Sequence, residues 1–452
     1  MNYTLHCAEV VRWSELYIGK KFHAVMCDPP YGLGFMDKDW DEAVHSKEWG
    51  EALIPILYPG ALVFMFGGTR TWHKLATGME AAGFEILDTL MWIHGSGFPK
   101  AQSIDKQLDD ESGADRTPIM ETKRDLFGEF EQEKKRTDGA GNTGDETVPF
   151  APPSSKNYSV TEPSEAAAPW AGHKTPALKP AWEPIIMFRA PREGYSYGQL
   201  AEKFGSGCLN TDGARIETRE KEQTQDYYNA TSIVPITGGR IGGKIYPADL
   251  GRYPANLILD LTSAEMMDEQ TKDKIHAAGY ATPGVYRSPS LGPVPIAPGG
   301  WSKRLGDSGG ASRFFYCAKA SRDERDAGLK GFELQAFGQS GGSQQALAEG
   351  KDEYLQEGHI GLNRIKMIRN PHPTVKPISL ICWLAKLLLP PDTIKPRRLL
   401  VPFAGSGSEM IGAIQAGWDE VEGIEESKEF CKIAQAQLDY WAKLAVQINM
   451  FE

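Results

Sequence analysis

The residues of this sequence best suited to chemistry are Asp28, Pro29, Pro30 and Tyr31, which follow the apolar run Phe22–Cys27. Neither proline can donate to a β-ladder, so the pair ends a strand and leaves the Pro29 carbonyl as an acceptor. A carboxylate, a carbonyl and an aromatic face can together hold an exocyclic amine on a flat ring, because the amine donates two hydrogen bonds while the ring stacks. The competing interpretation is a strand-ending turn with Tyr31 in the core.

A glycine-rich turn, Phe403–Gly407, follows a second apolar run, Arg398–Pro402, and suits a different task. Glycines let the backbone approach a ligand closely, and an acid at the end of the next strand, here Glu425, can bind ribose hydroxyls. The third glycine of a dinucleotide turn is absent, and Glu409 would repel a pyrophosphate held at the helix N-terminus. The turn therefore favours a nucleoside without phosphate, such as S-adenosylmethionine, over NAD, although tight packing alone also produces such turns.

A second glycine stretch, residues 238–244, has the spacing of a phosphate-binding loop but lacks the chemistry of one. Ile245 stands where such a loop places the Ser or Thr that binds Mg²⁺, and Tyr246–Pro247 blocks the helix that must follow. We interpret this stretch as a flexible basic loop.

Composition limits the class of protein. The chain has 452 residues and a net charge of −11, which argues against a surface coated in positive charge but leaves room for a local basic face. The six cysteines include no C-x-x-C pair, so we expect reduced thiols, no disulfide framework and no metal site. No apolar run reaches the roughly 18 residues of a membrane span and no signal peptide is visible, so we expect a cytoplasmic protein.

The elements that must position these residues alternate between strand and helix, which predicts an α/β fold with a crossover-connected sheet. The patterns predict strands at 22–27, 61–66, 89–93, 184–188, 398–402 and 420–424, and helices at 71–82, 378–389, 410–417 and from 428 onward. Residues from about 110 to 178 are polar and rich in Gly, Pro and Ser, which indicates a mobile insertion. We therefore expect three parts: 1–194 with this insertion, a loop-rich module at 195–360, and 361–452.

The combination of D-P-P-Y after one apolar strand and F-A-G-S-G after another resembles the amino-methyltransferases of DNA, which methylate adenine N6 or cytosine N4. Further motifs that match the family are YGLGFMDKDWD, WIHGSGFPK, LKPAWEPI, GRYPANLILD, ASRFFYCAKASRDER and HPTVKP, and together they cover most of the chain. The catalytic tetrapeptide precedes the cofactor turn, with a variable module between them, as in the permuted β class. The resemblance implies a Rossmann-like methyltransferase core, mostly parallel and permuted in order, with an inserted target-recognition module.

The resemblance also implies roles for individual residues. Asp28 and the Pro29 carbonyl would accept hydrogens from the target amine, with Pro30 stiffening the turn and Tyr31 stacking on the flipped base. The residues implied to hold S-adenosylmethionine are Phe403, Ala404, Gly405, Ser406, Gly407, Glu425, Thr374 and Lys376, together with Asp28. Trp182 lies near where the family places a second aromatic that stacks on the target base. Local basic patches, and not the resemblance, assign Arg364, Arg369, Arg240 and Lys244 to DNA phosphates. The family often has Gly-Asp near the N-terminus to contact the cofactor adenine, whereas this chain has Leu5–Glu9 there.

The resulting hypothesis is a site-specific methyltransferase that flips an adenine out of double-stranded DNA and methylates its N6 amine by direct displacement. Asp28 favours adenine because D-P-P-Y is commoner in the adenine enzymes. Cytosine N4 methylation and an inactive DNA-binding relative remain alternatives. No partner nuclease is evident, so the enzyme is either solitary or one half of a restriction–modification pair. It is either a monomer or a homodimer. Its expected place is the cytoplasm, associated with the nucleoid, in a bacterial or phage setting.

Overall fold

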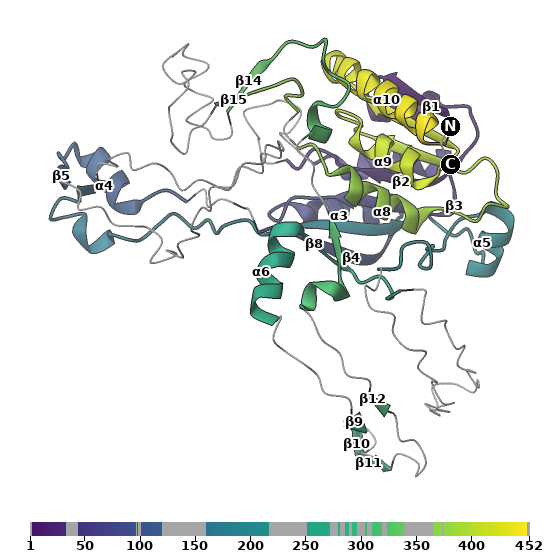
Figure 1. The fold of residues 1–452 in the computed structure, drawn as a ribbon, viewed down its shortest axis with the longest axis horizontal. Coiled ribbons are helices and arrows are strands. Elements are labelled where there is room, and N and C mark those ends of the chain that lie inside the picture. The colour runs from purple at the N-terminus through teal and green to yellow at the C-terminus, as the bar shows by residue number, and fades with distance from the viewer. Residues whose placement is uncertain are drawn as a thin grey trace, which may run out of the picture. The chain divides into compact units, whose positions relative to one another are not determined.

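The computed structural model describes residues 2–32, 44–95, 97, 101–119, 160–216, 251–271, 279–280, 285–288, 292–295, 303–304, 310–318, 323–338, 365–372 and 374–449. The chain forms two compact units (Figure 1). Unit 1 consists of Met1–Gly97, Ala181–Glu333 and Arg369–Glu452, and unit 2 of Phe98–Pro180 and Leu334–Ile368.

Unit 1 is built on an open sheet of nine strands. In spatial order the strands are β1 (Asn2–Cys7), β17 (Glu420–Glu425), β16 (Arg398–Pro402), β2 (Phe22–Cys27), β3 (Leu57–Phe66), β7 (Trp182–Arg189), β4 (Glu85–Ile93), β8 (Leu257–Asp260) and β13 (Tyr316–Ala318). All strands run parallel except β7, which is antiparallel to both of its neighbours. The prediction of an α/β fold with a mostly parallel sheet is confirmed.

Helices cover both faces of this sheet, so its central strands are buried along most of their length and are mostly apolar. One layer contains α1 (Val10–Leu16), α2 (Ser46–Leu53), the short 3₁₀ turn η3 (Ile54–Ile56) and α3 (Trp72–Ala82), whose apolar residues pack with those of β2 and β3. The other contains α8 (Ile378–Leu388), α9 (Ser408–Ala416) and α10 (Lys428–Asn449), which lie together over the sheet in Figure 1. All six residues of β2 are buried, as expected for a strand covered on both sides.

The chain reverses its direction of winding between β16 and β2. From β16 the chain continues through α9 to β17 on one side, whereas from β2 it continues through α2 to β3 on the other. The two strands are nevertheless neighbours, with Leu399 opposite Ala24 and Leu400 opposite Val25. Ligands of open α/β sheets bind outside the carboxyl ends of strands at such a switch point. The permuted order therefore brings the turn after β2 next to the turn after β16.

Several elements differ from the sequence-based predictions. The strand predicted at 61–66 begins at Leu57, and β1 and α1 have no predicted counterpart. The run 184–188 belongs to the antiparallel strand β7, a direction that its apolar composition does not reveal. Two strands from the expected loop-rich module, β8 and β13, extend the core sheet. Their pairing depends on β4 being available as an edge, which is a property of the assembled sheet.

Unit 1 also contains helices α5 (Tyr197–Phe204) and α6 (Leu261–Thr271), 3₁₀ turns η6 (Ala311–Phe314) and η7 (Asp323–Asp326), and short strands β9 (Gly279–Tyr280), β10 (Val285–Ser288), β11 (Gly292–Pro295) and β12 (Lys303–Arg304). Unit 2 contains α4 (Ile104–Ser112), β5 (Thr117–Ile119), β6 (Val160–Glu162), η4 (Ala168–Trp170), β14 (Gln335–Gly338) and β15 (Ile365–Ile368). The ends of the expected insertion are thus folded: β5 pairs with β6, and Arg116 bridges the buried Asp105 and Asp109 of α4.

Among the described helices, none combines the length and the apolar character that crossing a bilayer requires.

Candidate active site

The carboxylate of Asp28 lies directly after β2, at the switch point of the sheet, and both of its oxygens are engaged. The Tyr31 hydroxyl donates to Oδ1 at 2.6 Å, and Lys376 Nζ donates to Oδ2 at 2.5 Å. Only 8% of the Asp28 side chain and 4% of the Lys376 side chain are exposed, so this ion pair is shielded from water. The predicted catalytic turn is therefore paired with Lys376, which the family resemblance had assigned to cofactor binding.

Glu183 is a second carboxylate at this site, and sequence analysis missed it. Its Oε1 lies 2.5 Å from the Tyr31 hydroxyl, whose single proton is shared with Asp28, and 3.2 Å from Lys376 Nζ. A signal was present, because Glu183 is the only acid in β7, whose remaining residues are mostly apolar. Side chains alternate along a strand, so Trp182 points to the opposite face of the sheet from Glu183. Trp182 pairs with Ile93 of β4 and has no described contact with Asp28 or Tyr31.

The carboxylates of Asp28 and Glu183 control the ionisation of Lys376 and Tyr31. Burial opposes the ammonium, but the Asp28 and Glu183 carboxylates outweigh burial and raise the pKa of Lys376. Burial, together with the same two carboxylates, raises the pKa of Tyr31 well above its ordinary value. The ring of Phe66 lies 4.9 Å from Lys376 Nζ and adds a cation–π contact. Lys376 therefore stays charged and Tyr31 stays a hydrogen-bond donor at neutral pH.

The segment that carries Lys376 is held in place by η7. Arg325 Nε donates to the Asn370 carbonyl at 3.0 Å, and its Nη2 donates to the His372 carbonyl at 2.5 Å. Asp326 accepts from the backbone N–H groups of Arg369 and Asn370. These contacts explain how a residue 348 positions from Asp28 reaches it with a fixed geometry.

The turn after β16 has a backbone conformation that favours glycine at two positions. Gly405 and Gly407 have φ values of 52° and 90°, in the left-handed region that favours glycine. A Cβ on Gly405 would lie 2.7 Å from His372 Nε2, so no side chain fits there. Phe403 also has a positive φ of 59°, which is strained for a bulky residue, and its ring packs edge-on against Trp49. Strain of this kind concentrates at ligand sites.

The polar groups around this turn are suited to a nucleoside. Glu425, at the end of β17, accepts from the backbone N–H of Gly405 and of Ser427, each at 2.8 Å, which leaves lone pairs on both oxygens. Burial raises the pKa of Glu425. The Ser406 hydroxyl is buried in the turn and has no partner among the described residues. A buried hydroxyl without a partner is costly, and a ligand that bonds to it would remove that cost.

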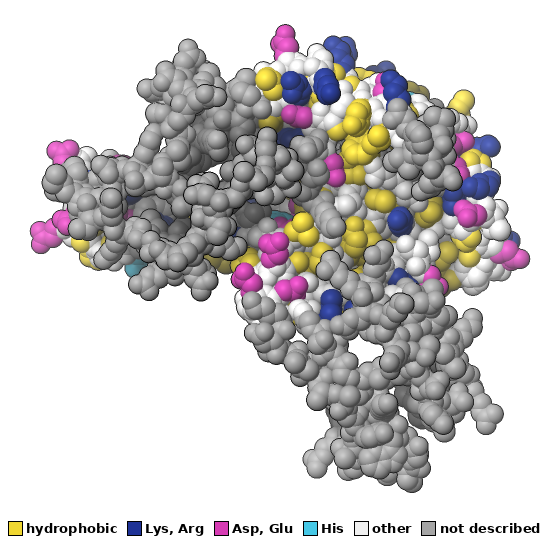
Figure 2. Space-filling model, viewed as in Figure 1, with side chains coloured by type: hydrophobic (Ala, Val, Ile, Leu, Met, Phe, Trp, Pro, Cys, Tyr) yellow, Lys and Arg dark blue, Asp and Glu magenta, His cyan; other side chains and the backbone are white. Residues whose placement is uncertain are grey.

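Other predicted site residues lie around this centre or outside the described ranges. The backbone N–H of Thr374 donates to His372 Nδ1 at 3.4 Å, which places it close to the glycine turn. Arg369 is half-buried, and its Nε has no partner among the described residues. Arg364, Arg240 and Lys244 lie outside the described residues, as does the stretch 33–43 with its acids. In Figure 2, basic and acidic side chains both occur around the coloured part of the surface.

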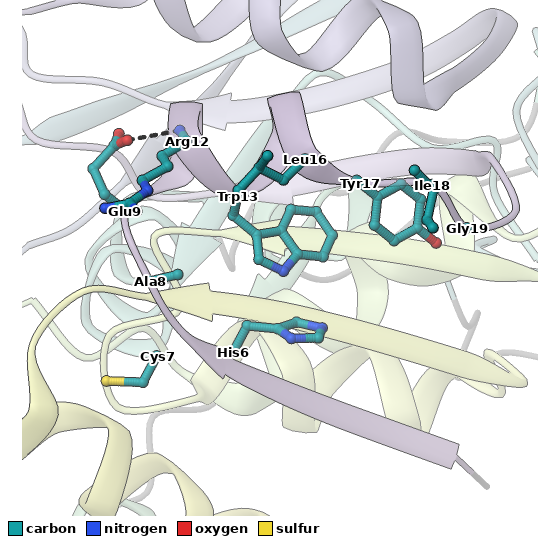
Figure 3. Close-up of a pocket in the computed structure, with 10 residues that line it drawn as sticks. All are labelled: His6, Cys7, Ala8, Glu9, Arg12, Trp13, Leu16, Tyr17, Ile18 and Gly19. Carbon is teal, nitrogen blue, oxygen red and sulfur yellow. Dashed lines mark hydrogen bonds between the residues drawn. The ribbon is translucent and has the colours of Figure 1, made fainter.

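A surface hollow of about 550 Å³ lies beside the site, between β1 and α1. Figure 3 shows His6, Trp13 and Tyr17 along it. The ring centroids of His6 and Trp13 are 4.8 Å apart, and those of Trp13 and Tyr17 are 4.7 Å apart. Glu9 is the acid of the stretch Leu5–Glu9, in which sequence analysis found no Gly-Asp to contact the cofactor adenine. Its carboxylate instead accepts from the backbone N–H groups of Val11 and Arg12 at 2.9 and 2.8 Å and caps α1. Glu9 thus serves the helix in this structure.

The first turn of α9 places the buried carboxylate of Glu409 next to the turn after β16, where a pyrophosphate would need positive surroundings. This arrangement, beside the acid–aromatic turn of the neighbouring strand, defines an S-adenosylmethionine-dependent amino-methyltransferase. The chain belongs to the DNA methylase family of N6 and N4 methyltransferases, whose model matches residues 22–436. S-adenosylmethionine is accordingly its cofactor and DNA its substrate.

Three solved structures that resemble the chain are all distant from it in sequence. The M1.HpyAVI–SAM complex is 11% identical, with 97% of this chain and 99% of that chain covered and a TM-score of 0.34. A putative DNA modification methylase from Thermus thermophilus, complexed with S-adenosyl-L-methionine, is 11% identical, with 98% and 93% covered and a TM-score of 0.34. The cytosine-N4-specific PvuII DNA methyltransferase is 10% identical, with 97% and 86% covered and a TM-score of 0.37. All three TM-scores lie below 0.5, so these likenesses add nothing to the family match. No curated protein matches the chain.

The imidazole of His372 makes the stability of this region depend on pH. Burial lowers its pKa from 6.5 to about 4, with Lys376 and Arg325 adding to the effect and Asp28 opposing it. The unfolded chain therefore takes up the proton first, and stability that is present above pH 6.5 is lost as the pH falls toward 4. Between about pH 7 and pH 5, we expect the free energy of unfolding of His372→Gln to fall by about 2 kcal/mol less than that of the wild type.

Urea denaturation at the two pH values measures this difference. His73→Gln, which removes an exposed imidazole on α3, is the matched control. Equal losses of stability in the His372 variant and the wild type would contradict the assignment. His23 is also buried, with its pKa lowered to about 4, but its contribution is common to both proteins and cancels.

Proposed function

We propose that this DNA methylase is a site-specific adenine-N6 methyltransferase that acts on a base flipped out of duplex DNA. The observation that carries the proposal is the position of Asp28. Its carboxylate follows the strand next to the glycine turn, and it is fixed there by Tyr31 and Lys376. An aspartate at the head of this tetrapeptide is the form that resembles the adenine enzymes, whereas serine is commoner in the cytosine-N4 enzymes.

Asp28 and the Pro29 carbonyl would act on the amine of the target base. The lone pair of an exocyclic amine is delocalised into its ring, so the nitrogen is a poor nucleophile. Accepting both N–H hydrogens favours a pyramidal nitrogen and directs its lone pair toward the methyl group, which the bound cofactor supplies from a sulfonium. Catalysis in this scheme comes from positioning and electrostatics, and no covalent enzyme intermediate forms.

Tyr31, in a turn that Pro30 stiffens, would supply the face on which the flipped base stacks. Flipping costs a few kcal/mol of lost stacking, and an aromatic platform offsets part of it, about 1–3 kcal/mol per base. The short contacts of the Tyr31 hydroxyl with Asp28 and Glu183, which share its proton, hold the ring in one orientation. We propose no such role for Trp182, because it lies on the other face of the sheet.

The cofactor would lie along the turn Phe403–Gly407, with Glu425 binding its ribose hydroxyls. This placement is supported by the two glycines with positive φ and by the buried Ser406 hydroxyl without a described partner. Thr374 and Lys376 would face the methionine end of the cofactor, since their segment packs on Gly405 through His372.

Residues 195–360 would read the DNA sequence, with β8 and β13 anchoring that module to the catalytic sheet. Its basic residues, including Arg240 and Lys244, together with Arg364 and Arg369, would contact phosphates. Binding that rests on such contacts weakens steeply as salt is added.

Nucleoside mass spectrometry tests the proposed reaction. DNA is incubated with the purified protein and S-adenosylmethionine whose methyl group carries an isotope label, then digested to nucleosides. We expect labelled N6-methyladenine, and none in the same DNA incubated without protein. Labelled N4-methylcytosine would instead show the cytosine reaction, and no labelled nucleoside would show an inactive relative. Sequencing of the methylated positions would then give the recognition site.

A further inference from the structure

Glu409 is a buried carboxylate that the proposed reaction does not use. It stands in the first turn of α9, two residues after Gly407, and is 3% exposed. The Ser408 hydroxyl donates to its Oε2 at 2.9 Å. Carboxylates are almost never fully buried unless they are paired, so the presence of this one calls for an electrostatic partner.

The charged groups around Glu409 do not supply that partner. Asp28 and Cys27 at the end of β2, and Lys376 before α8, are the titratable groups that interact with it electrostatically. Lys376 is already shared between Asp28 at 2.5 Å and Glu183 at 3.2 Å, and Glu409 forms no ion pair with any residue that the structure describes. Two carboxylates thus pair with the Lys376 ammonium and the third, that of Glu409, interacts with it only electrostatically, so these groups carry an excess of negative charge.

Two buried polar groups nearby indicate that a ligand completes this region. The Ser406 hydroxyl, within the glycine turn, has no described partner, and neither has Asn370 Nδ2, on the segment that leads to Lys376. Both residues are at most 1% exposed. Hydrogen-bonding groups buried in this way are normally satisfied, so the turn is shaped to receive polar atoms from outside the chain.

We propose that Glu409 is a specificity-determining residue that makes the site prefer the cationic cofactor, S-adenosylmethionine, over its neutral product, S-adenosylhomocysteine. The two molecules differ by one methyl group and by the positive charge on sulfur. A carboxylate in a site with low exposure attracts that charge strongly, since little water screens it. Transfer of the methyl group removes the charge, and the same carboxylate then ceases to favour the bound species.

The proposal rests on S-adenosylmethionine being the cofactor and is independent of which base is methylated. Burial and the neighbouring Asp28 raise the pKa of Glu409 to about 7, while Lys376 opposes them. Glu409 is therefore mostly ionised at about pH 8 and mostly neutral at about pH 6. The preference for the cation should therefore be strongest at the higher pH. Titrating groups that the two ligands share affect both Kd values, so their effects cancel in the ratio of the two.

Calorimetric titration with each ligand tests the role of Glu409. We expect Glu409→Gln to reduce the ratio Kd(S-adenosylhomocysteine)/Kd(S-adenosylmethionine) by about tenfold, through weaker binding of the cation, with binding of the product changed less than about twofold. Glu429→Gln is the matched control, because Glu429 is an exposed acid in the first turn of α10. It should leave the ratio unchanged.

The wild-type protein provides an independent measurement that does not depend on the folding of a variant. Its Kd ratio should fall severalfold from about pH 8 to about pH 6. An equal weakening of both ligands in Glu409→Gln would show a merely structural role, and a pH-independent ratio in the wild type would also overturn the proposal. Wild-type protein that binds neither ligand would overturn the cofactor assignment itself and the role of Glu409 with it.

Discussion

Replacing Asp28 by asparagine should lower the rate of methyl transfer by about a thousandfold, the size of effect seen when one preorganised polar group is removed from an active site. The amide keeps the shape of the side chain but loses its charge and presents an N–H group where the target amine must donate. Because the interaction is made with the reacting nitrogen, the loss should appear in kcat, with the Kd of S-adenosylmethionine changed only a few-fold. Single-turnover methylation and calorimetric titration measure the two quantities.

The control for this variant is Asp212→Asn, which removes a carboxylate that is 64% exposed and paired with Arg215. Surface ion pairs of this kind contribute little, so its activity and stability should match those of the wild type. An Asp28→Asn protein that is folded and transfers methyl groups at the wild-type rate would refute the proposed role of Asp28.

Replacing Lys376 by methionine should lower the free energy of unfolding by about 3–5 kcal/mol, because it leaves the carboxylates of Asp28 and Glu183 buried without their cation. The variant should also lose methyl transfer. Lys395→Met is the matched control, since Lys395 is 53% exposed and pairs with Asp419 at the surface. That variant should lose no more than about 1 kcal/mol.

The dependence of stability on pH separates this explanation from a simple packing defect. Unpaired buried carboxylates take up protons more readily in the folded than in the unfolded state, so their folded pKa values rise. The folded variant is then stabilised as the pH falls, and the deficit of Lys376→Met should shrink from about pH 8 to about pH 5. A deficit that is constant across this range in urea denaturation would indicate lost packing instead. The double variant Lys376→Met with Asp28→Asn should recover part of the lost free energy of unfolding.

Local patterns predicted much of the fold because they depend on neighbouring residues. The strand 398–402 begins and ends where the structure has β16, and the strand 22–27 coincides with β2. Long apolar runs of this kind bury themselves in any sheet, whichever strand lies beside them. The direction of β7 could not be predicted in this way, since its apolar residues satisfy a parallel and an antiparallel neighbour equally well.

The sequence by itself determined the two turns of the site. Prolines after β2 and glycines after β16 impose their backbone geometry over a few adjacent residues, so their consequences can be read locally. The tertiary structure alone decided which groups share the charge of Lys376. Asp28 and Lys376 are 348 positions apart, and Glu183 reaches them only because the antiparallel β7 returns its first residues to the same edge of the sheet. Electrostatic partnership depends on distances in space, and these exist only once the strand order of the whole sheet is set.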